Sequence, residues 1–434
     1  MSPVIVGYIG VVVLLIVFLL GMPVAFAMMS VGFVGMLYLL PAEAAFRFLA
    51  MDIFGRFSEY QFSVIPMFIL MGYFASLSGM TTRLYEIAYV WIGHLRGGLS
   101  MATIVACALF SSVTGSSAAT AATIGKVAYP EMKKYGYDDA LSTGCIAGAG
   151  TLGPMIPPST GMIIYGLLTE QSIGKLFLSG ILPGVLLSVL FMITVTTMCT
   201  INSSLGPPGP STPMKQKLSV LPGLLEALAL FLLVVGGLFL GLFTPTQAGG
   251  AGAAGALIVG LIRRNITWKS LWESTKDALL ISCMVLCLIT GAMVFGHFLS
   301  LSTMSIALTE WVYQLNVSRL VVLIIVCFFY IIGGCVIDCM GLIVLTIPIV
   351  TPVIFGLGYD PIWFAVVLGL LGETGVITPP VGVNVYVLKG IIPDVPISRM
   401  FVGIIPFFFA ILVGLVLIII FPSIATFLPS LVSY

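Results

Sequence analysis

Residues 148–166 read GAGTLGPMIPPSTGMIIYG, and this stretch decides the fold of the chain. Prolines and glycines at this density cannot sustain one continuous helix, because proline lacks a backbone N–H and clashes with the preceding turn. We therefore predict a helix over residues 140–149 that breaks near 150–158 and resumes after the break. A broken helix exposes carbonyls from one half, which suit a cation, and N–H groups from the other, which suit a carboxylate. A simple proline kink is the alternative.

The second half of the chain repeats this pattern. Residues 371–390 read LGETGVITPPVGVNVYVLKG, and Gly-x-x-x-Pro-Pro recurs at an offset of 222 residues, from Gly153 to Gly375. The tripeptide Gly-Tyr-Asp at 136–138 returns at 358–360 in the same register, and GYFASLSGM at 72–80 returns as GHFLSLSTM at 296–304. Shared Gly, Pro and Asp positions indicate an internal duplication, which is the usual architecture of a secondary transporter.

A segment rich in small residues precedes each break. Residues 110–130 read FSSVTGSSAATAATIGKVAYP, which is too polar for a span that faces lipid. We predict a re-entrant helical hairpin with its tip near 112–117, because exposed carbonyls at membrane depth are tolerated only where they line a cavity. The alternative is a tightly packed interface of small residues.

The matching hairpin contains GGCVIDCMGLIVLTIP at residues 333–348, and its Asp338 aligns with Ser116. An ionisable residue inside a membrane segment is a functional hypothesis by default, so we predict that Asp338 is the intramembrane charge of this hairpin. A carboxylate that caps the returning helix is the alternative role. Glu373 stands just before the second break, and Lys389 is its candidate partner.

The composition excludes most other classes of protein. The 434 residues are 60% apolar and 8% charged, with a mean hydropathy of +1.21. A soluble domain carries about 25% charged residues, so this chain must face lipid. A net charge of +1 without a basic stripe excludes nucleic-acid binding. The eight cysteines lack metal or redox spacing and no ATP-binding loop is present, so we expect neither an enzyme nor a cofactor.

Basic residues indicate how the two repeats are oriented. Lys126, Lys133 and Lys134 surround the first Gly-Tyr-Asp loop, whereas the equivalent loop near residue 358 carries neither Lys nor Arg. Basic loops stay on the cytoplasmic side, so the equivalent loops lie on opposite sides and the repeats are inverted. Among the remaining charged residues, we interpret His94 and His297 as interface or packing residues rather than proton relays. We interpret Arg263, Arg264 and Lys269 as a solvated cytoplasmic cluster rather than a binding site.

The motifs GSSAATAATIG at 115–125 and GVITPPVGVNVYVLKG at 375–390 resemble the large membrane subunit of tripartite ATP-independent periplasmic (TRAP) transporters. The resemblance runs from about residue 5 to residue 425. It implies an elevator transporter, in which a mobile transport domain slides against a scaffold. It also implies two partners, a periplasmic substrate-binding protein and a small four-helix membrane subunit. Because Met1 opens directly into the first span, we expect that subunit to be a separate chain.

The expected fold class is an all-α polytopic membrane protein with an inverted-repeat elevator transporter fold, two re-entrant helical hairpins and two broken helices. In the first half we predict scaffold spans and interfacial arm helices over 1–60 and a first repeat over 61–200 with hairpin 99–130 and broken helix 140–168. A polar inter-repeat loop follows over 201–218. In the second half we predict scaffold spans over 219–277, a second repeat over 278–400 with hairpin 318–352 and broken helix 361–390, and a C-terminal span over 401–434.

The resemblance implies two sodium sites, each made by a hairpin tip and a helix break, and Na⁺ as the coupling ion. The first group comprises Ser112, Gly115, Ser116, Ser117, Gly150, Thr151 and Gly153. The second comprises Gly333, Gly334, Asp338, Glu373, Thr374, Gly375, Thr378 and Pro379. The predicted substrate contacts are Ser116, Thr120, Pro157, Pro158, Ser159, Thr160, Pro380 and Asn384.

The function that follows is sodium-coupled uptake of an organic acid, such as a C4-dicarboxylate or sialic acid, across a bacterial or archaeal cytoplasmic membrane. A stand-alone sodium/carboxylate symporter of a related fold is the first alternative. A channel is disfavoured, because channels usually build a pore around a symmetry axis and need no broken-helix repeat. An intramembrane enzyme would need a catalytic pair at matching depth, and the sequence shows none.

Overall fold

The computed structural model describes residues 1–315 and 317–432, and every regular element in that part of the chain is a helix. The first half contains α1 (Pro3–Leu19), α2 (Val24–Leu39), α3 (Ala42–Ser58), α4 (Val64–Leu77), α5 (Met80–Ile92), α6 (Gly98–Thr114), α7 (Ser117–Lys134), α8 (Asp139–Gly150), α9 (Thr160–Thr169) and α10 (Ile173–Ile201). The predicted hairpin therefore corresponds to α6 and α7, and the predicted broken helix to α8 and α9.

The second half follows after a loop. It contains α11 (Met214–Ser219), α12 (Pro222–Phe231), α13 (Gly237–Phe239), α14 (Pro245–Ile262), α15 (Trp268–Leu301), α16 (Met304–Gln314), α17 (Arg319–Gly334), α18 (Cys339–Gly356), α19 (Pro361–Val376), α20 (Val383–Ile391), α21 (Ile397–Ile420) and α22 (Ser423–Ser430). The second hairpin is α17 and α18, and the second broken helix is α19 and α20. These elements confirm the predicted all-α class with two hairpins and two broken helices.

Matching local geometry relates the two repeats. Gly79 before α5 and Thr303 before α16 both have left-handed backbone, with φ of 73° and 54°. The serine before each of them donates its hydroxyl to the carbonyl three residues earlier, Ser78 at 2.7 Å and Ser302 at 2.9 Å. Asp138 and Asp360 cap α8 and α19 by accepting backbone N–H groups. Each of these side chains satisfies free groups at a helix end, so the same residue types set the same element boundaries in both repeats.

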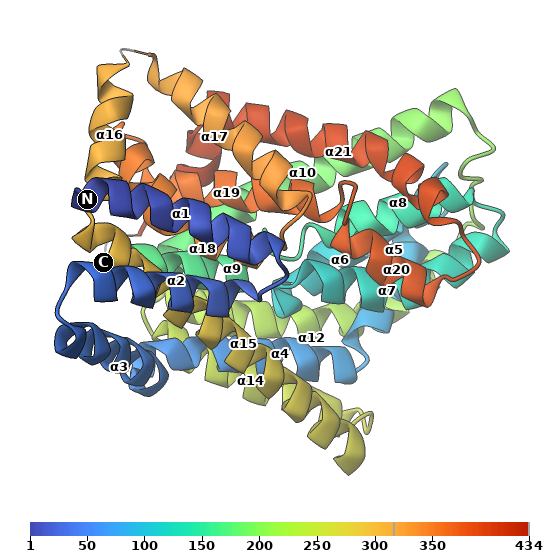
Figure 1. Ribbon diagram of the computed structural model, residues 1–434. Coiled ribbons are helices and arrows are strands. Elements are labelled where there is room, and N and C mark those ends of the chain that lie inside the picture. The colour runs from blue at the N-terminus through green and yellow to red at the C-terminus, as the bar shows by residue number, and fades with distance from the viewer. Residues whose placement is uncertain (316, 433–434) are drawn as a thin grey trace.

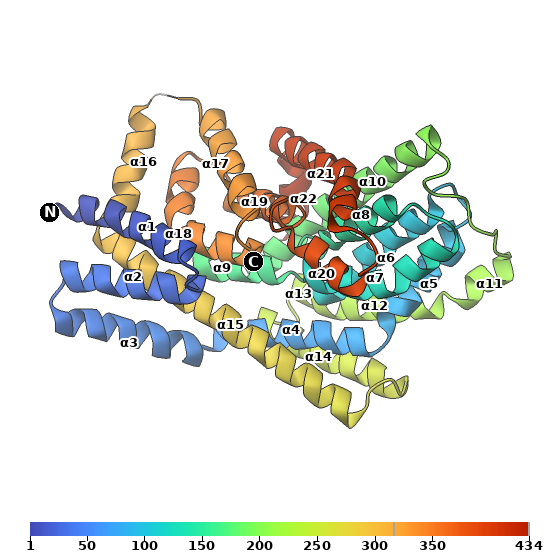
Figure 2. The ribbon, with the colours of Figure 1, turned by 45° about the vertical axis from the view of Figure 1, so that its right-hand side comes forward.

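The two hairpins come from opposite sides of the molecule. Figures 1 and 2 show α17 and α18 on the left and α6 and α7 farther to the right, and in Figure 2 α19 and α8 lie between them. Their tips approach each other, because Ser116 at the first tip and Met340 beside the second line one cavity. This arrangement agrees with the inverted orientation that the lysines predict.

Helices from one repeat pack on helices from the other. Small residues permit the contact between α2 and α15, where a β-carbon on Gly32 would lie 2.8 Å from the Cα atom of Phe295. The equivalent contact joins α14 to α4, where a β-carbon on Gly249 would lie 2.9 Å from the β-carbon of Met67. The repeats are therefore interlocked rather than placed side by side.

Long apolar helices carry the chain through the membrane. Within residues 1–315 and 317–432, seven helices are long and apolar enough to cross it, and one of them is α18 of the second hairpin. The shorter apolar helices include α6 and α17 of the hairpins and α9 and α19 of the broken helices. Large side chains such as Leu19, Phe328 and Val402 are exposed on the outer faces. A surface of this kind is stable only against lipid, so the chain is a multi-pass membrane protein.

Two charged residues make contacts that the sequence does not predict. His297 is not only a packing residue, because its Nδ1 lies 2.8 Å from Oδ2 of the buried Asp52 on α3. Arg263 is not simply solvated, because it pairs with Glu226, which also pairs with Arg83 at 2.8 Å. In both cases the partner is far away in the sequence and comes close only when the helices pack.

Candidate functional site

The first hairpin tip is attached to the first helix break. Ser116 caps α7 by accepting the Ala119 N–H at 3.4 Å. The hydroxyl of Thr160, at the start of α9, donates to the Gly115 carbonyl at 3.1 Å. Gly153 packs directly on the tip, because a β-carbon there would lie 2.7 Å from the Ser116 carbonyl oxygen. The fold thus brings the tip and the break of the first predicted group together.

The second tip and break repeat this attachment. Asp338 caps α18 by accepting the Met340 N–H at 3.2 Å. The backbone N–H of Val381 donates to the Cys335 carbonyl at 3.3 Å. Gly334 and Gly375 pack backbone to backbone, and a β-carbon on Gly334 would lie 3.0 Å from the Gly375 Cα atom. The two groups are therefore equivalent in position and similar in construction.

The remaining members of the predicted groups are placed less uniformly. Thr151 is buried, and its hydroxyl donates to the Gly148 carbonyl at 2.6 Å, whereas the Ser112 hydroxyl donates to the Leu109 carbonyl within α6. Gly333 packs against Leu342 inside the second hairpin rather than against the break. The first break is almost wholly buried, but Pro379, Pro380 and Val381 in the second break are exposed. The two breaks thus differ in their access to the surroundings.

The buried carboxylate of the site is Glu373, not Asp338. Asp338 is exposed at its tip and acts as the capping carboxylate, whereas Glu373 is 1% exposed. The predicted partner of Glu373 is wrong, because Lys389 donates to the carbonyls of Pro393 and Val395. Ser117 of the first hairpin is a polar residue close to Glu373. The carboxylate therefore lies where the two repeats meet.

Asn384 of α20 belongs to the same buried cluster. Its side chain is fully buried, and its Nδ2 donates to the Ser117 hydroxyl at 2.8 Å and to the Ala147 carbonyl at 3.1 Å. Asn384 does not line the cavity described next, and neither do Pro157, Pro158, Ser159, Pro380 and Thr120. Thr120 contacts the Thr114 hydroxyl at 3.1 Å instead.

A cavity of about 220 Å³ lies where both hairpin tips face the helices α4 and α15. Ser116 and Thr160 are the two predicted substrate contacts that line it. The rest of its wall includes Ile69, Gly72, Tyr73, Ser76, Phe110, Thr114, Ala119, Thr123, Ile281, Val285 and Met340. A largely apolar wall with a few hydroxyl groups is typical of a small-molecule site.

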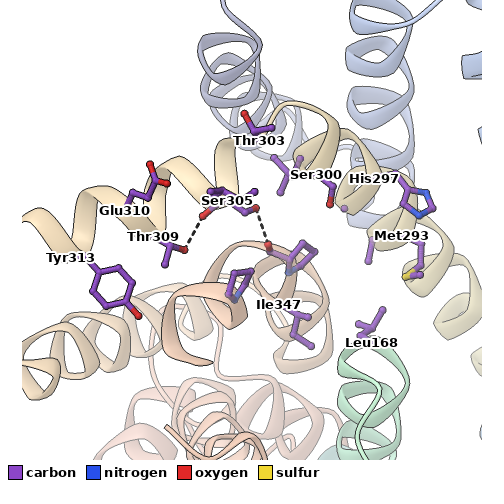
Figure 3. A pocket seen from close by; sticks show the side chains of 16 residues that line it. Leu168, Met293, His297, Ser300, Thr303, Ser305, Thr309, Glu310, Tyr313 and Ile347 are labelled. Atoms are coloured by element: carbon purple, nitrogen blue, oxygen red, sulfur yellow. Dashed lines mark hydrogen bonds between the residues drawn. The ribbon is translucent and has the colours of Figure 1, made fainter. Parts of the chain in front are cut away.

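A second cavity of about 590 Å³ uses the equivalent face of α15. Its residues Met293, Gly296, His297 and Ser300 correspond at an offset of 224 residues to Ile69, Gly72, Tyr73 and Ser76, which line the first cavity. Figure 3 shows Ile347 of α18 and Leu168 of α9 across from this face. Equivalent faces of α4 and α15 therefore line the two cavities. The face of α4 lies opposite the tip of the first hairpin, whereas the face of α15 lies opposite the side of α18 in the second hairpin.

Several wall residues escape prediction from the motifs alone. Tyr73 and Ser76 lie in the repeated segment 72–80, so the internal match offers a signal for them. Ile281 and Val285 on α15 carry no such signal, because they are ordinary apolar residues of a long span.

An ion pair outside the spans ties the first repeat to α21. Arg399 donates to the Asp138 carboxylate at 2.7 Å, and the backbone N–H of Ala140 donates to the same side chain at 2.8 Å. Partial burial raises the pKa of Asp138, but the Arg399 guanidinium and the backbone N–H groups outweigh it and hold that pKa below its usual value. The carboxylate stays ionised and caps α8 at neutral pH.

Solved transporter structures share the fold at low sequence identity. The Alcanivorax borkumensis YdaH transporter matches with a TM-score of 0.62 and 16% identity over 90% of this chain and 89% of its own. Neisseria gonorrhoeae MtrF, described among antimetabolite efflux pumps, matches with a TM-score of 0.58 and 13% identity over 96% of this chain and 95% of its own.

Relatives found by sequence comparison share a higher identity with this chain than the solved structures do. The C4-dicarboxylate TRAP transporter large permease protein DctM of Pseudomonas aeruginosa is 33% identical over 92% of this chain and 94% of its own. The sialic acid TRAP transporter large permease protein SiaM of Vibrio cholerae is 28% identical over 95% of each chain. Residues 11–424 match the family model for the DctM component of tripartite ATP-independent periplasmic transporters. The chain belongs to that family of transporter permeases, as the motifs at its hairpin and its second break predict.

Proposed function

We propose that the chain carries an organic acid into the cell by sodium-coupled secondary active transport in the cytoplasmic membrane. It receives the acid from a periplasmic substrate-binding protein and works with a small membrane subunit on a separate chain. The observation that carries this proposal is the cavity between the two hairpin tips, where Ser116 and Thr160 supply hydroxyl groups. The N-terminal end of α7 begins there, and such a helix end favours an anionic group.

The substrate class follows from relatives of this chain. Their names specify C4-dicarboxylates, sialic acid, isethionate and ectoine, and each of these compounds carries an acidic group. A cavity of about 220 Å³ suits a small acid better than a large one. We therefore place C4-dicarboxylates first.

Sodium coupling is supported by the oxygen atoms at each tip and break. Hard cations bind oxygen ligands from carbonyls, hydroxyls and carboxylates. The first group offers Ser116 and Thr151, and the second offers Asp338 and the Thr378 hydroxyl, beside carbonyls that the broken helices expose. Each group joins a hairpin to a break, so a bound cation would hold the two together.

An elevator movement is supported by the two equivalent cavities. The face of α4 around Gly72 contacts the first hairpin tip, since a β-carbon on Gly72 would lie 3.2 Å from the Thr114 Cα atom. The equivalent face of α15 around Gly296 meets only the flank of α18, at Pro348. Sliding the hairpins and broken helices relative to α4 and α15 would exchange these environments, which gives alternating access.

Uptake into proteoliposomes tests the proposal. We expect inward Na⁺ gradients to drive accumulation of radioactive succinate only when the chain, its small subunit and its binding protein are all present. A K⁺ gradient of equal size is the control and should drive none. Succinate uptake without the binding protein would favour the stand-alone symporter. Uptake that ignores Na⁺ would contradict the coupling.

A further inference from the structure

A cavity of about 400 Å³ lies where α17 begins and α21 ends, at the other end of α17 from the hairpin tip. Its wall includes Arg319, Leu320, Tyr359, Asp360 and Trp363. The helix α19 packs against both α17 and α21, and Figure 2 shows it between them. The proposed transport of an organic acid makes no use of this cavity.

The duplication indicates which side of the membrane the cavity faces. Tyr359 and Asp360 correspond at an offset of 222 residues to Tyr137 and Asp138. The lysines near the first pair place it on the cytoplasmic side, so the inverted repeat places the cavity on the periplasmic side. The apolar run of α17 begins directly after Arg319, and tyrosine and tryptophan are enriched at the membrane interface. The cavity therefore lies at the level of the lipid headgroups.

Exposed apolar side chains lead from the cavity toward the middle of the membrane. On α17, Leu320, Ile324 and Phe328 are exposed and follow one another at a spacing of four residues, which places them on one face of the helix. On α21, Val416 and Ile420 are exposed near the end that reaches the cavity. These faces offer a surface for acyl chains below a headgroup.

Arg319 supplies the positive charge of the cavity. Between Lys276 and Lys389 it is the one Lys or Arg in the sequence. Its guanidinium carbon lies 5.6 Å from the centre of the Tyr359 ring, and that ring stacks on Trp363 at 5.2 Å with an angle of 15° between the ring planes. In the part of the chain that the structure describes, Arg319 forms no ion pair. The rings thus orient a guanidinium whose N–H donors remain available to a phosphate.

Asp360 supplies the negative charge, and a comparison with Asp138 shows what its surroundings lack. Each of the two carboxylates caps a helix through Oδ1, and Asp360 accepts the backbone N–H groups of Ile362 and Trp363, both at 2.8 Å. Oδ2 of Asp138 accepts a hydrogen bond from Arg399 at 2.7 Å. Oδ2 of Asp360 accepts none from residues 1–315 and 317–432, and Asp360 is exposed. The second repeat therefore keeps the cap but leaves the position of the cationic partner open.

One guanidinium and one open carboxylate oxygen in the same cavity suit a ligand that carries both charges. A phosphate complements Arg319, and a primary ammonium can donate a hydrogen bond to Asp360. A trimethylammonium group has no N–H to donate, and an anionic headgroup without an amine would be repelled by the carboxylate. The ethanolamine phosphate headgroup meets both requirements.

We propose that this cavity binds a phosphatidylethanolamine molecule of the periplasmic leaflet. Its phosphate pairs with Arg319, its ammonium replaces the partner that Asp360 lacks, and its acyl chains lie on the exposed faces of α17 and α21. The bound lipid joins the beginning of the second hairpin to α21. This site depends on the membrane fold of the chain and is independent of sodium coupling.

Native mass spectrometry of the full chain with its small subunit tests the site. The complex is taken from nanodiscs that contain equal amounts of phosphatidylethanolamine, phosphatidylcholine and phosphatidylglycerol with identical acyl chains. We expect the wild type to retain phosphatidylethanolamine in preference to the other two lipids, and Arg319→Gln to retain at least tenfold less of it. Asp360→Asn keeps the helix cap and should lose the preference for phosphatidylethanolamine over phosphatidylcholine. Arg96→Gln, in the exposed turn before α6, is the matched control and should behave as the wild type.

Equal retention of phosphatidylethanolamine by Arg319→Gln and the wild type would overturn the proposal, and so would a wild type that retains all three lipids equally. If Arg319→Gln fails to fold, Leu320→Trp provides a second test, because it fills the cavity from an exposed position and should also lose the lipid. Weaker binding of the periplasmic protein by Arg319→Gln, with unchanged lipid retention, would assign the cavity to that partner and overturn the lipid site.

Discussion

Gly153 lies against Ser116 so closely that a β-carbon at Gly153 would be 2.7 Å from the Ser116 carbonyl oxygen. This contact seats the first hairpin tip on the first break. Gly153→Ala should push the tip away, at a cost of about 1–3 kcal/mol for overpacking, and should abolish uptake while the protein still inserts. Gly390→Ala is the matched control, since nothing lies within 4 Å of a β-carbon there. Normal uptake by Gly153→Ala would show that the tip needs no such contact.

Ser116 and Asp338 cap the returning helices of the two hairpins, α7 and α18. Replacing either with Ala should cost about 1 kcal/mol of capping free energy and remove an oxygen from a predicted cation group. We expect each variant to need more Na⁺ for half-maximal uptake, measured in proteoliposomes, with normal membrane insertion. Unchanged Na⁺ dependence in either variant would remove that residue from the coupling sites.

Ala119 lines the cavity between the tips and projects from α7. A larger side chain there should fill the space that the substrate needs. Ala119→Phe should therefore lose succinate uptake and retain Na⁺ binding, measured on the same preparation. Ala254→Phe is the control, because Ala254 is exposed on α14 and does not line the cavity. Wild-type uptake by Ala119→Phe would place the substrate elsewhere.

The contact between Gly72 of α4 and Thr114 of the first hairpin tests the elevator. A β-carbon on Gly72 would lie 3.2 Å from the Thr114 Cα atom, so the two backbones are close enough for a cross-link between engineered cysteines. Gly72→Cys with Thr114→Cys should arrest uptake on oxidation and regain it on reduction. The exposed Cys283 should first be replaced by Ser. Full uptake by the cross-linked protein would argue against sliding.

The ion pair of Asp138 and Arg399 predicts a dependence of stability on pH. The pKa of Asp138 is lowered in the folded protein, so its contribution is fully present above the unfolded value of about 3.9 and is lost as the pH falls through the folded value. The pair is partly exposed, so solvent screening makes its contribution to stability small. Melting temperatures of the wild type and Asp138→Asn should converge below about pH 4. A constant difference down to pH 3 would contradict this assignment.

The sequence predicts where the helices of the site begin and end better than it predicts which side chains contact one another there. Clusters of Gly, Pro and Ser disrupt helices locally, so the tip at Gly115 and the break before Thr160 could be located from composition. Partners that depend on packing could not be located. Asn384 reaches Ser117 across 267 residues, and no local pattern encodes such a contact.

The same limit explains why the sequence points to Asp338, rather than Glu373, as the intramembrane charge. Asp338 aligns with Ser116 and therefore attracts attention in the sequence, but it is exposed and caps a helix. Glu373 stands beside ordinary glycines and threonines, and only the tertiary fold buries it. The burial of a side chain depends on how the helices pack. The sequence shows only that an acidic residue is present at each position.

The interlocked packing of α2 on α15 and of α4 on α14 also bears on how the protein is made. A ribosome that has just completed α10 has already released α2 and α4, but their partner helices do not yet exist. At that stage Gly32 and Met67 lack Phe295 and Gly249, the residues that they contact in the folded protein. These two contacts therefore form only after α14 and α15 have been made, and the first half made by itself would lack both of these partner helices.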